Sequence, residues 1–354
     1  MPKPSNSTVS MADVARLAGV SESTVSRALN NNPAINVATR ERIQGIAQSL
    51  GYRPNIGARN LRLQRSHIIA VVINHDSTRE DSTTQSLADP FMTTITSAIA
   101  DALNEQHYGL LFASSHIKPG MWYEHLLQNG RADGLIVIGR GANEASFSDL
   151  LAADAPFVVW GQADASTPYT CIGSDNLLGG QQAAQQLILS GSTLPLFLGD
   201  IQHTEIRQRY AGFQQAFRQA HIEVPPPVFT DDFSPESGYR ALKQWISGQP
   251  QPFDGLFAAS DNLALGALQA LHEHGVRIPR DVAVIGYDDI DLAAVSIPPL
   301  TSIHQEIKRG GKLLVNALMD TLEGRPVRSQ RIPTRVVIRQ TSCHISNKPT
   351  TGDF

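Results

Sequence analysis

Residues 11–30, MADVARLAGVSESTVSRALN, have the pattern of two short helices joined by a tight turn. Ser10 and Asp13 have the spacing of a capping box, which satisfies free amide groups at the start of the first helix. Gly19 can end that helix because glycine enters a left-handed conformation without steric cost. Ser21 can cap the second helix with its hydroxyl group. The pattern therefore predicts a helix-turn-helix, whose second helix docks in the major groove of DNA.

Apolar residues in this region predict the buried faces of the helices. In the first helix they are Val14, Ala15 and Ala18, and in the second they are Val20, Val25 and Leu29. A third helix is expected between Asn36, which can cap it, and Gly51, which can end it. Three helices can bury a minimal core, which a lone helical hairpin at a chain terminus cannot.

Charge is distributed unevenly along the chain of 354 residues. The first 65 residues hold nine Lys and Arg against three Asp and Glu, and the other 289 hold 20 against 30, giving net charges of +6 and −10. A basic segment on an acidic body is typical of nucleic-acid binding, because positive charge attracts the phosphate backbone. We therefore interpret residues 1–52 as a DNA-binding headpiece.

Three segments of this region follow one another: DVARLAGVSESTVSRALN (13–30), TRERIQGIAQSLGYRPN (39–55) and ARNL (58–61). Together they resemble the headpiece of the LacI/GalR family of bacterial transcription regulators. The resemblance implies that residues 53–65 form a hinge helix, two copies of which meet in the minor groove, where Leu61 wedges between base steps. An ordinary basic linker is the alternative interpretation, because Gly57 weakens so short a helix.

The resemblance and side-chain chemistry together predict the residues that contact DNA. Arg27 is expected to read bases directly, because its guanidinium fork can pair with O6 and N7 of guanine. Glu22 and Ser23 match the start of the recognition helix. Glu22 is unusual there, since a carboxylate repels phosphates. Its expected role is either to accept a hydrogen bond from a cytosine amino group or to exclude other bases. Phosphate contacts are expected from Ser21, Thr24, Ser26, Asn30, Thr39, Tyr52 and Asn55. Contacts from the hinge are expected from Ala58 and Leu61.

From residue 68 onward, predicted strands alternate with predicted helices. The run IIAVVIN (68–74) is continuously apolar, as expected of a strand buried on both faces. Further strands are expected at GLLFAS (109–114), DGLIVIG (133–139), PFVVWG (156–161), TCIGSDN (170–176), LPLFLGD (194–200), PVFTDDF (227–233), FDGLFAAS (253–260), DVAVIGYDD (281–289), LTSIH (300–304) and TRVVIRQ (334–340). The alternation predicts a parallel α/β architecture with too many strands for one compact sheet.

The resemblance implies a specific fold class: an N-terminal all-α helix-turn-helix headpiece, followed by an α/β periplasmic-binding-protein-like core of two doubly wound subdomains. We expect the core at residues 66–345 and a polar tail at 346–354. The N-subdomain is expected at about 66–168 plus 305–326, and the C-subdomain at about 169–304 plus 327–345. The loop after His75 is long and polar, and is interpreted either as a lid over the cleft or as a disordered segment.

Ligands of open α/β sheets bind beyond the carboxyl ends of the strands. The resemblance implies that Arg209 in RQRYAGF and Asp288 in GYDD clasp an effector from the C-terminal lobe. A guanidinium fork and a carboxylate suit the hydroxyl groups of a sugar. The resemblance also implies that the same cleft is lined by Phe91, Met92, Phe233 and Ser260. Each of these residues also has a plain structural explanation, such as core packing for the phenylalanines and turn formation for Asp288.

The chain departs from the family pattern at the end of the PFVVW strand. Many relatives carry an aspartate there, often followed by arginine, whereas this chain has Gly161-Gln162. Trp160 and Gln162 are expected to contact the effector instead, by stacking and amide hydrogen bonds. Because this position helps to set ligand choice, the identity of the effector is not implied by the resemblance.

The function expected from these features is that of a repressor of a carbohydrate-utilisation operon. The expected partners are a palindromic double-stranded DNA operator and a sugar or sugar phosphate, whose binding releases the protein from the operator. A purine- or nucleoside-type corepressor is the alternative effector. One headpiece buries too little surface for tight specific binding, so a homodimer is expected. The tail after Arg339 has no leucine heptad, which argues against the tetramerising helix of some relatives.

Other function classes lack support in the sequence. We expect no enzyme activity, metal or other cofactor, because no nucleophile elbow, P-loop or zinc-ligand spacing occurs. Residues 139–144 begin like a dinucleotide-binding loop but lack its third glycine. No apolar run is long enough to cross a bilayer and no secretory signal is seen, so a cytoplasmic location without membrane partners is expected. Cys171 and Cys343 are too few and too distant to indicate a disulfide framework.

Overall fold

The computed structural model describes residues 9–52, 65–74, 89–113, 120–140, 147–164, 166–248 and 251–342. The chain divides into two compact units, Met1–Arg65 and Ser66–Phe354. The division falls at the residue where we expected the core to begin.

The first unit is a three-helix headpiece of α1 (Met11–Ala18), α2 (Glu22–Leu29) and α3 (Val37–Ser49). The predicted capping box is confirmed, because Ser10 Oγ accepts from the Asp13 amide while the Asp13 carboxylate accepts from the Ser10 amide. Gly19 ends α1 with a φ of 62°. The headpiece core is formed by Val14, Ala15, Ala18, Val25, Ala28, Ile43 and Ala47.

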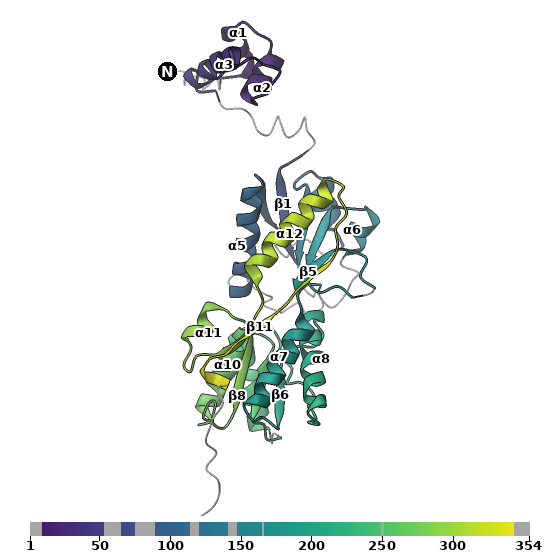
Figure 1. The fold of residues 1–354 in the computed structure, drawn as a ribbon, viewed down its shortest axis with the longest axis vertical. Coiled ribbons are helices and arrows are strands. Elements are labelled where there is room, and N and C mark those ends of the chain that lie inside the picture. The colour runs from purple at the N-terminus through teal and green to yellow at the C-terminus, as the bar shows by residue number, and fades with distance from the viewer. Residues whose placement is uncertain are drawn as a thin grey trace, which may run out of the picture. The chain divides into compact units, whose positions relative to one another are not determined.

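The second unit contains two sheets (Figure 1). The first sheet has the strand order β10-β5-β4-β3-β1-β2, and all its pairs are parallel. Its strands are β1 (Ile68–Ile73), β2 (Gly109–Ala113), β3 (Gly134–Ile138), β4 (Phe157–Trp160), β5 (Cys171–Ser174) and β10 (Gln330–Ile332). The second sheet has the order β11-β9-β8-β7-β6 and is parallel except for the β11–β9 pair. Its strands are β6 (Pro195–Leu198), β7 (Gly255–Ala258), β8 (Ala283–Asp288), β9 (Thr301–His304) and β11 (Arg335–Val337).

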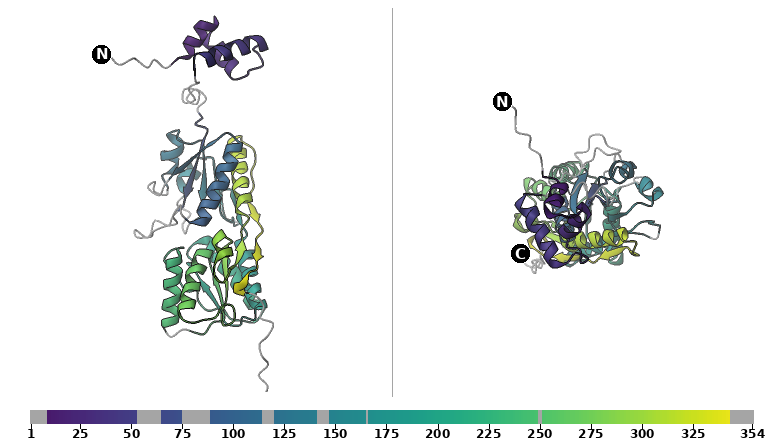
Figure 2. Two further views of the ribbon diagram at one scale, coloured as in Figure 1. Left: turned by 90° about the vertical axis from the view of Figure 1, so that its left-hand side faces the viewer. Right: turned by 90° about the horizontal axis from the view of Figure 1, so that it is seen from above.

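Paired helices cover the sheets. In the first lobe, α5 (Pro90–Glu105) packs against α12 (Ile307–Leu322), and Figure 2 shows the two side by side. The second lobe has the pairs α7 (Asn176–Leu189) with α8 (Thr204–Gln219), and α9 (Pro235–Ser247) with α10 (Asp261–Glu273). The shorter helical elements are the π-helix η1 (Tyr123–Gln128), α6 (Ser148–Ala152), α11 (Asp291–Val295) and the 3-10 helix η3 (Gln340–Ser342).

The chain crosses between the lobes three times, after β5, after β9 and after β10. The last crossing is the yellow segment that runs from one lobe to the other in Figures 1 and 2. The expected subdomain boundaries at 168/169 and 326/327 are wrong by several residues. Cys171–Ser174 pairs with β4, and Gln330–Ile332 pairs with β5, so both strands belong to the first lobe. The strand expected at residues 227–233 is reduced to a single bridge between Val228 and Leu198.

Close helix crossings in the second lobe depend on glycine. A Cβ atom on Gly180 in α7 would overlap the backbone carbonyl of Arg209 in α8. We therefore expect Gly180→Ala to lower the free energy of unfolding by about 1–3 kcal/mol, since overpacked cores cost this much. Gly45→Ala in α3 is the matched control, because no atom lies within 4 Å of its added Cβ. Denaturant unfolding should show Gly45→Ala as neutral or stabilising; equal destabilisation by both variants would contradict the crossing as the cause.

Candidate functional site

The exposed face of α2 carries the residues expected to read DNA. Glu22, Ser23, Arg27 and Asn30 are exposed, while Thr24 and Ser26 are half-buried. The hydroxyl of Ser21 caps α2 by accepting from the Thr24 amide at 3.3 Å, which holds the start of the helix. This face therefore presents one guanidinium, several hydroxyls and one carboxylate to solvent.

Two other predicted residues of the headpiece lie at its helix ends. Thr39 is in the first turn of α3, where its amide donates to Asn36 Oδ1 at 2.8 Å. Tyr52 is half-buried against the headpiece core, and burial together with the nearby Glu22 carboxylate raises the pKa of its phenol. Tyr52 therefore lies close to the recognition helix. Asn55, Ala58 and Leu61 lie outside the described residues, as does most of the hinge segment 53–65.

Buried polar side chains gather in the core at the carboxyl ends of the strands of both sheets. Each lies at the last residue of a parallel strand or shortly after it: Asn74, Arg140, Gln162, Asn176, Asp200, Ser260, Asp288 and Gln305. Since ligands of open α/β sheets bind beyond the carboxyl ends of the strands, this edge is the candidate ligand site.

Arg209 lies on α8 with its guanidinium buried and held on several sides. Its Nε donates to Asn176 Oδ1 at 2.9 Å, and its Nη1 donates to the carbonyl of Ala259 at 2.5 Å. The guanidinium stacks 3.6 Å from the centroid of the Tyr287 ring. These contacts hold the fork in one orientation, as recognition of a ligand oxygen requires.

Asp288 ends β8 with a φ of 113°, a conformation that side-chain-bearing residues rarely adopt. Backbone strain of this kind clusters at ligand sites. Gln305 donates to Asp288 Oδ1, whereas Oδ2 has no hydrogen-bond donor within the described part of the chain. Burial raises the pKa of Asp288 well above its ordinary value; the Arg209 charge opposes this, while Asp261 and Asp89 reinforce it. Asp288, Arg209 and Asp89 therefore form one electrostatic cluster.

Direct hydrogen bonds join the two lobes, one of them at this cluster. Asp89 caps α5 of the first lobe, and its Oδ2 accepts from Asn262 Nδ2 of the second lobe at 3.0 Å. Burial raises the pKa of Asp89, against the opposing effect of the α5 amides and Asn262. The amide of Arg140 in the first lobe donates to Glu205 Oε1 in the second at 3.0 Å. The strand ends of the two sheets therefore face each other across a polar interface.

The other predicted effector residues differ in their surroundings. Phe91 is half-buried, and its ring lies 6.2 Å from that of Trp160. Trp160 and Met92 both belong to the apolar core of the first lobe, and Met92 is only 2% exposed. Phe233 packs edge-on against His203. Gln162 accepts from the Asn176 amide, and Ser260 caps α10 through the Leu263 amide.

Several residues of this interface were not singled out from the sequence. They are Asn74, Arg140, Asn176, Glu205, Asn262 and Gln305. Arg140 lies in the segment that begins like a dinucleotide-binding loop; its Nη1 donates instead to the Gln162 carbonyl and to Asp164. Only its position directly after a predicted strand was available as a signal.

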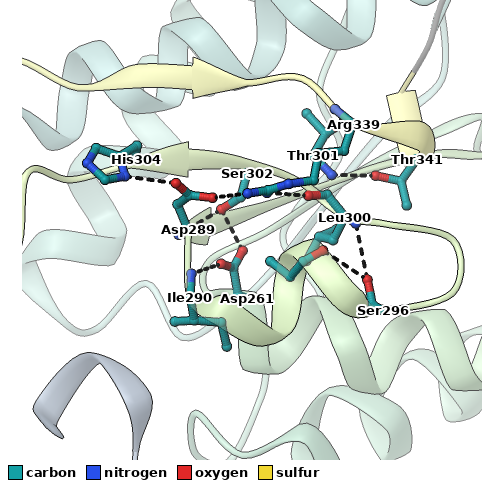
Figure 3. A network of polar contacts seen from close by, with 11 residues as sticks. Asp261, Asp289, Ile290, Ser296, Leu300, Thr301, Ser302, His304, Arg339 and Thr341 are labelled. Atoms are coloured by element: carbon teal, nitrogen blue, oxygen red, sulfur yellow. Dashed lines mark hydrogen bonds and ion pairs between the residues drawn. The ribbon is translucent and has the colours of Figure 1, made fainter. Parts of the chain in front are cut away.

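Behind the site, a buried polar network joins β8, β9 and α10 (Figure 3). Asp261 is completely buried and accepts from Ser302 Oγ at 2.6 Å and from the Ile290 amide at 2.9 Å. Asp289 is held by Arg339 at 2.6 Å and by His304 Nδ1 at 2.8 Å. The network supports the β8 end that carries Asp288.

The pH dependence of stability should reveal the buried Asp261. Burial raises its pKa from the ordinary 3.8 to about 7, so the folded protein holds this proton more tightly than the unfolded chain. The free energy of unfolding should therefore fall as the pH rises from 3.8 to about 7, by up to about 1.4 kcal/mol per pH unit. In Asp261→Asn, whose amide can keep both hydrogen bonds, the decline should be shallower by the contribution of Asp261, while Asp288 and Asp89, whose pKa values burial also raises, still contribute.

Asp281→Asn provides the control for this pH experiment. Hydrogen bonds from the Arg277 side chain and amide lower the pKa of Asp281 to about 2, so its contribution has the opposite sign. Its loss should lower stability only above about pH 2 and leave the decline between pH 3.8 and 7 in place. Unfolding curves that show the same decline in Asp261→Asn as in the wild type would contradict the assignment.

The described residues contain neither a membrane-spanning helix nor a metal-binding cluster. No helix in the described ranges combines the length and apolar character that a membrane crossing requires. Within the same ranges, no three His, Cys, Asp or Glu side chains are grouped so that they would hold a metal ion.

Comparison with known protein families identifies both units of the chain. Residues 10–55 match the profile described as "Bacterial regulatory proteins, lacI family", and residues 184–342 match "Periplasmic binding protein-like domain". The ribose operon repressor of Escherichia coli (strain K12) is 30% identical over 335 residues, which cover 93% of this chain and 98% of the repressor. The transcriptional repressor PurR of Haemophilus influenzae (strain PittEE) is 32% identical over 318 residues, covering 88% and 90%.

A solved structure contains the same folds. The Lac repressor dimer bound to operator and the anti-inducer ONPF superposes with a TM-score of 0.82 at 27% identity, covering 94% of this chain and 99% of that one. The expected fold class is thereby confirmed, both for the headpiece and for the two-lobed core.

Proposed function

Since the chain belongs to the LacI family of bacterial regulatory proteins, we propose that it binds a palindromic operator as a homodimer and is released by a sugar or sugar phosphate. The chain is a DNA-binding transcriptional repressor of that family and not an enzyme. The operator, the effector and the assembly are the parts that we propose. The proposed place of action is the cytoplasm, where the operator would be found.

The recognition helix supports the proposed operator contacts. Arg27 is the proposed base-reading residue, because it is exposed on the face that also carries Glu22 and Ser23. Phosphate contacts are proposed for Ser21, Thr24, Ser26, Asn30, Thr39, Tyr52 and Asn55, and minor-groove contacts for Ala58 and Leu61.

An exposed apolar surface on the second lobe supports the proposed homodimer. Large apolar side chains of α11 and its neighbouring segments are exposed to solvent: Leu292, Val295, Ile297 and Ile338. Ile297 is 95% exposed. In the first lobe, β2 forms an edge of its sheet within the described strands. Apolar surfaces and open strand edges are commonly covered by a second subunit.

The cluster of Arg209, Asp288 and Asp89 supports a sugar effector. Two carboxylates can accept from hydroxyl groups and one guanidinium can donate to them, which matches the mixed donors and acceptors of a polyol. Two acidic groups beside a single guanidinium do not suit a phosphate, so the cluster suits an unphosphorylated part of the ligand. Further effector contacts are proposed for Phe91, Met92, Trp160, Gln162, Phe233 and Ser260.

A purine-type corepressor remains the alternative ligand, supported by the relative named PurR. Calorimetry with panels of sugars, purines and pyrimidines separates the two ligand classes. The polar interface between the lobes supports a common mechanism for either, in which the ligand binds one lobe arrangement more tightly than the other. Operator affinity then changes only by that difference in binding.

The observation that carries the proposal is the exposed face of α2, with Arg27, Glu22 and Ser23, in a helix-turn-helix headpiece. The same chain continues into a periplasmic-binding-protein-like core. The test of the proposal is selection of genomic DNA fragments on the purified full-length protein at physiological salt. We expect a palindrome whose half-sites lie roughly one helical turn apart, about 10 base pairs. If no sequence is enriched, with or without a metabolite extract, the proposal is wrong. Genes beside the selected site would identify the effector to be tested.

A further inference from the structure

Two turns of the core share the sequence Asp-Gly-Leu and the same hydrogen-bonding arrangement. Asp133 lies directly before β3, and Asp254 lies directly before β7. Each carboxylate accepts hydrogen bonds from the segment that enters the neighbouring parallel strand, which is β1 in the first lobe and β6 in the second. A carboxylate that accepts from several amides holds that backbone firmly, because charge-assisted hydrogen bonds are strong.

Asp133 holds the point at which the linker from the headpiece enters the core. Its Oδ1 accepts from the Ser66 amide at 2.6 Å and from the Ser66 hydroxyl at 2.8 Å. Its Oδ2 accepts from the His67 amide at 2.9 Å. The amide of Asp133 in turn donates to the carbonyl of Ile68 at 2.8 Å. Since Ser66 is the first residue of the second compact unit, the contact lies where the two units join in sequence.

The opposite side of the same segment is held by strand β2. The Gly109 amide donates to the His67 carbonyl at 2.8 Å, and the ring of Tyr108 lies 5.3 Å from that of His67. His67 has a φ of 54°, the left-handed conformation that costs a residue with a Cβ roughly 1–2 kcal/mol. Such strain persists only where the surroundings hold it. Residues 66 and 67 are therefore held in one backbone conformation directly before β1 of the first sheet.

We propose that Asp133 is a positioning residue for operator binding, which transmits the arrangement of the first lobe to the linker through Ser66 and His67. The proposal rests on the proposed function, because it requires an operator and a linker that contributes to binding it. A lobe movement changes operator affinity only when the linker moves with the lobe. The hydrogen bonds from Ser66 and His67 to Asp133 are called the clamp below. A linker released from this clamp still tethers the headpiece but no longer orients it.

The test compares Asp133→Ala with Asp254→Ala in the full-length protein. Asp254 is the matched control, because it accepts from the Thr193 and Leu194 amides in the same way but at the entry to β6. Affinity is measured for the selected operator and for a scrambled duplex, well below the unfolding temperature of each variant. Asp133→Ala should weaken operator binding about tenfold, within the range of typical coupling between sites. Its binding to the scrambled duplex should match the wild type.

Each outcome shows whether Asp133 positions the linker for operator binding or only stabilises the fold. Operator affinity that falls in Asp133→Ala and not in Asp254→Ala supports the proposal. Equal loss in both variants, or loss in neither, overturns it. A wild-type protein that binds no operator under any condition contradicts the proposed function instead, which is a distinct result.

A measurement without substitution covers the case in which Asp133→Ala does not fold. Amide hydrogen exchange in the wild-type protein reports directly on the clamp. The amides of Ser66 and His67 should exchange as slowly as those of Thr193 and Leu194, since both pairs donate to a clamping carboxylate. Fast exchange at Ser66 and His67 alone would overturn the proposal.

Discussion

Replacing Asp288 with asparagine should weaken effector binding about 10–100-fold, the range expected when a charge-assisted hydrogen bond is lost. Gln305 already donates to Oδ1 of Asp288, so Oδ2 is the atom that would meet the ligand. In the wild type this position is a carboxylate oxygen that accepts from a hydroxyl group. In the variant it becomes an NH₂ group, which can only donate. Release of the operator should then require a correspondingly higher effector concentration.

The same substitution should leave operator affinity without effector within about twofold of the wild type, because no proposed DNA contact is touched. Asp291→Asn is the matched control, since Asp291 is exposed at the start of α11 and only three residues away. Calorimetry with the sugar nominated by the selected operator provides the measurement. A normal effector response in Asp288→Asn would show that the ligand site has been assigned to the wrong residues.

The pH gives an independent check on Asp288. Burial raises the pKa of this carboxyl group, so lowering the pH protonates it while most other carboxylates remain charged. If the ligand requires the ionised form, the affinity of the wild type should fall as the pH is lowered through this raised pKa. The affinity of Asp288→Asn should not follow that profile, because its amide does not titrate.

The headpiece was predictable from sequence because its determinants are local. The capping pairs are separated by three residues, and the buried positions repeat at the helical period. Each helix can therefore be placed from a short window of sequence. The main refinement is that Ala28 of α2 is buried, whereas Val20, which precedes α2, and Leu29 at its end are only partly buried.

The lobes of the core were predictable in type, whereas their boundaries were not. The register of β10 with β5 pairs Gln330 with Ile172, residues far apart in the sequence. A strand of three residues has too little apolar pattern to indicate such a partner. The same limit applies to Arg140 and Glu205, whose contact depends on how two lobes meet. Carboxyl ends of strands predict where a ligand site lies but not which side chains meet there.

Replacing Arg27 with alanine should cause the largest loss of operator binding. A bidentate contact to guanine is worth about 1–3 kcal/mol in each half-site. If both subunits of a dimer lose it, affinity should fall roughly 30-fold to 20 000-fold. The loss should be confined to operators with the original base, because Arg27 is exposed on α2 and is not needed for the headpiece core. Competition binding against operators with each base at that position provides the measurement.

Arg16→Ala is the control for the loss of one positive charge from the same headpiece. Arg16 lies on α1, where it pairs with Asp13 and its side chain is 78% exposed. An exposed pair of this kind contributes little to stability, so this variant should bind the operator nearly as the wild type does. If Arg27→Ala instead weakens binding to all sequences alike and reduces the salt dependence by about two ions, one for each subunit, Arg27 contacts a phosphate. Half-site specificity would then have to come from Glu22 and Ser23, the exposed residues at the start of the same helix.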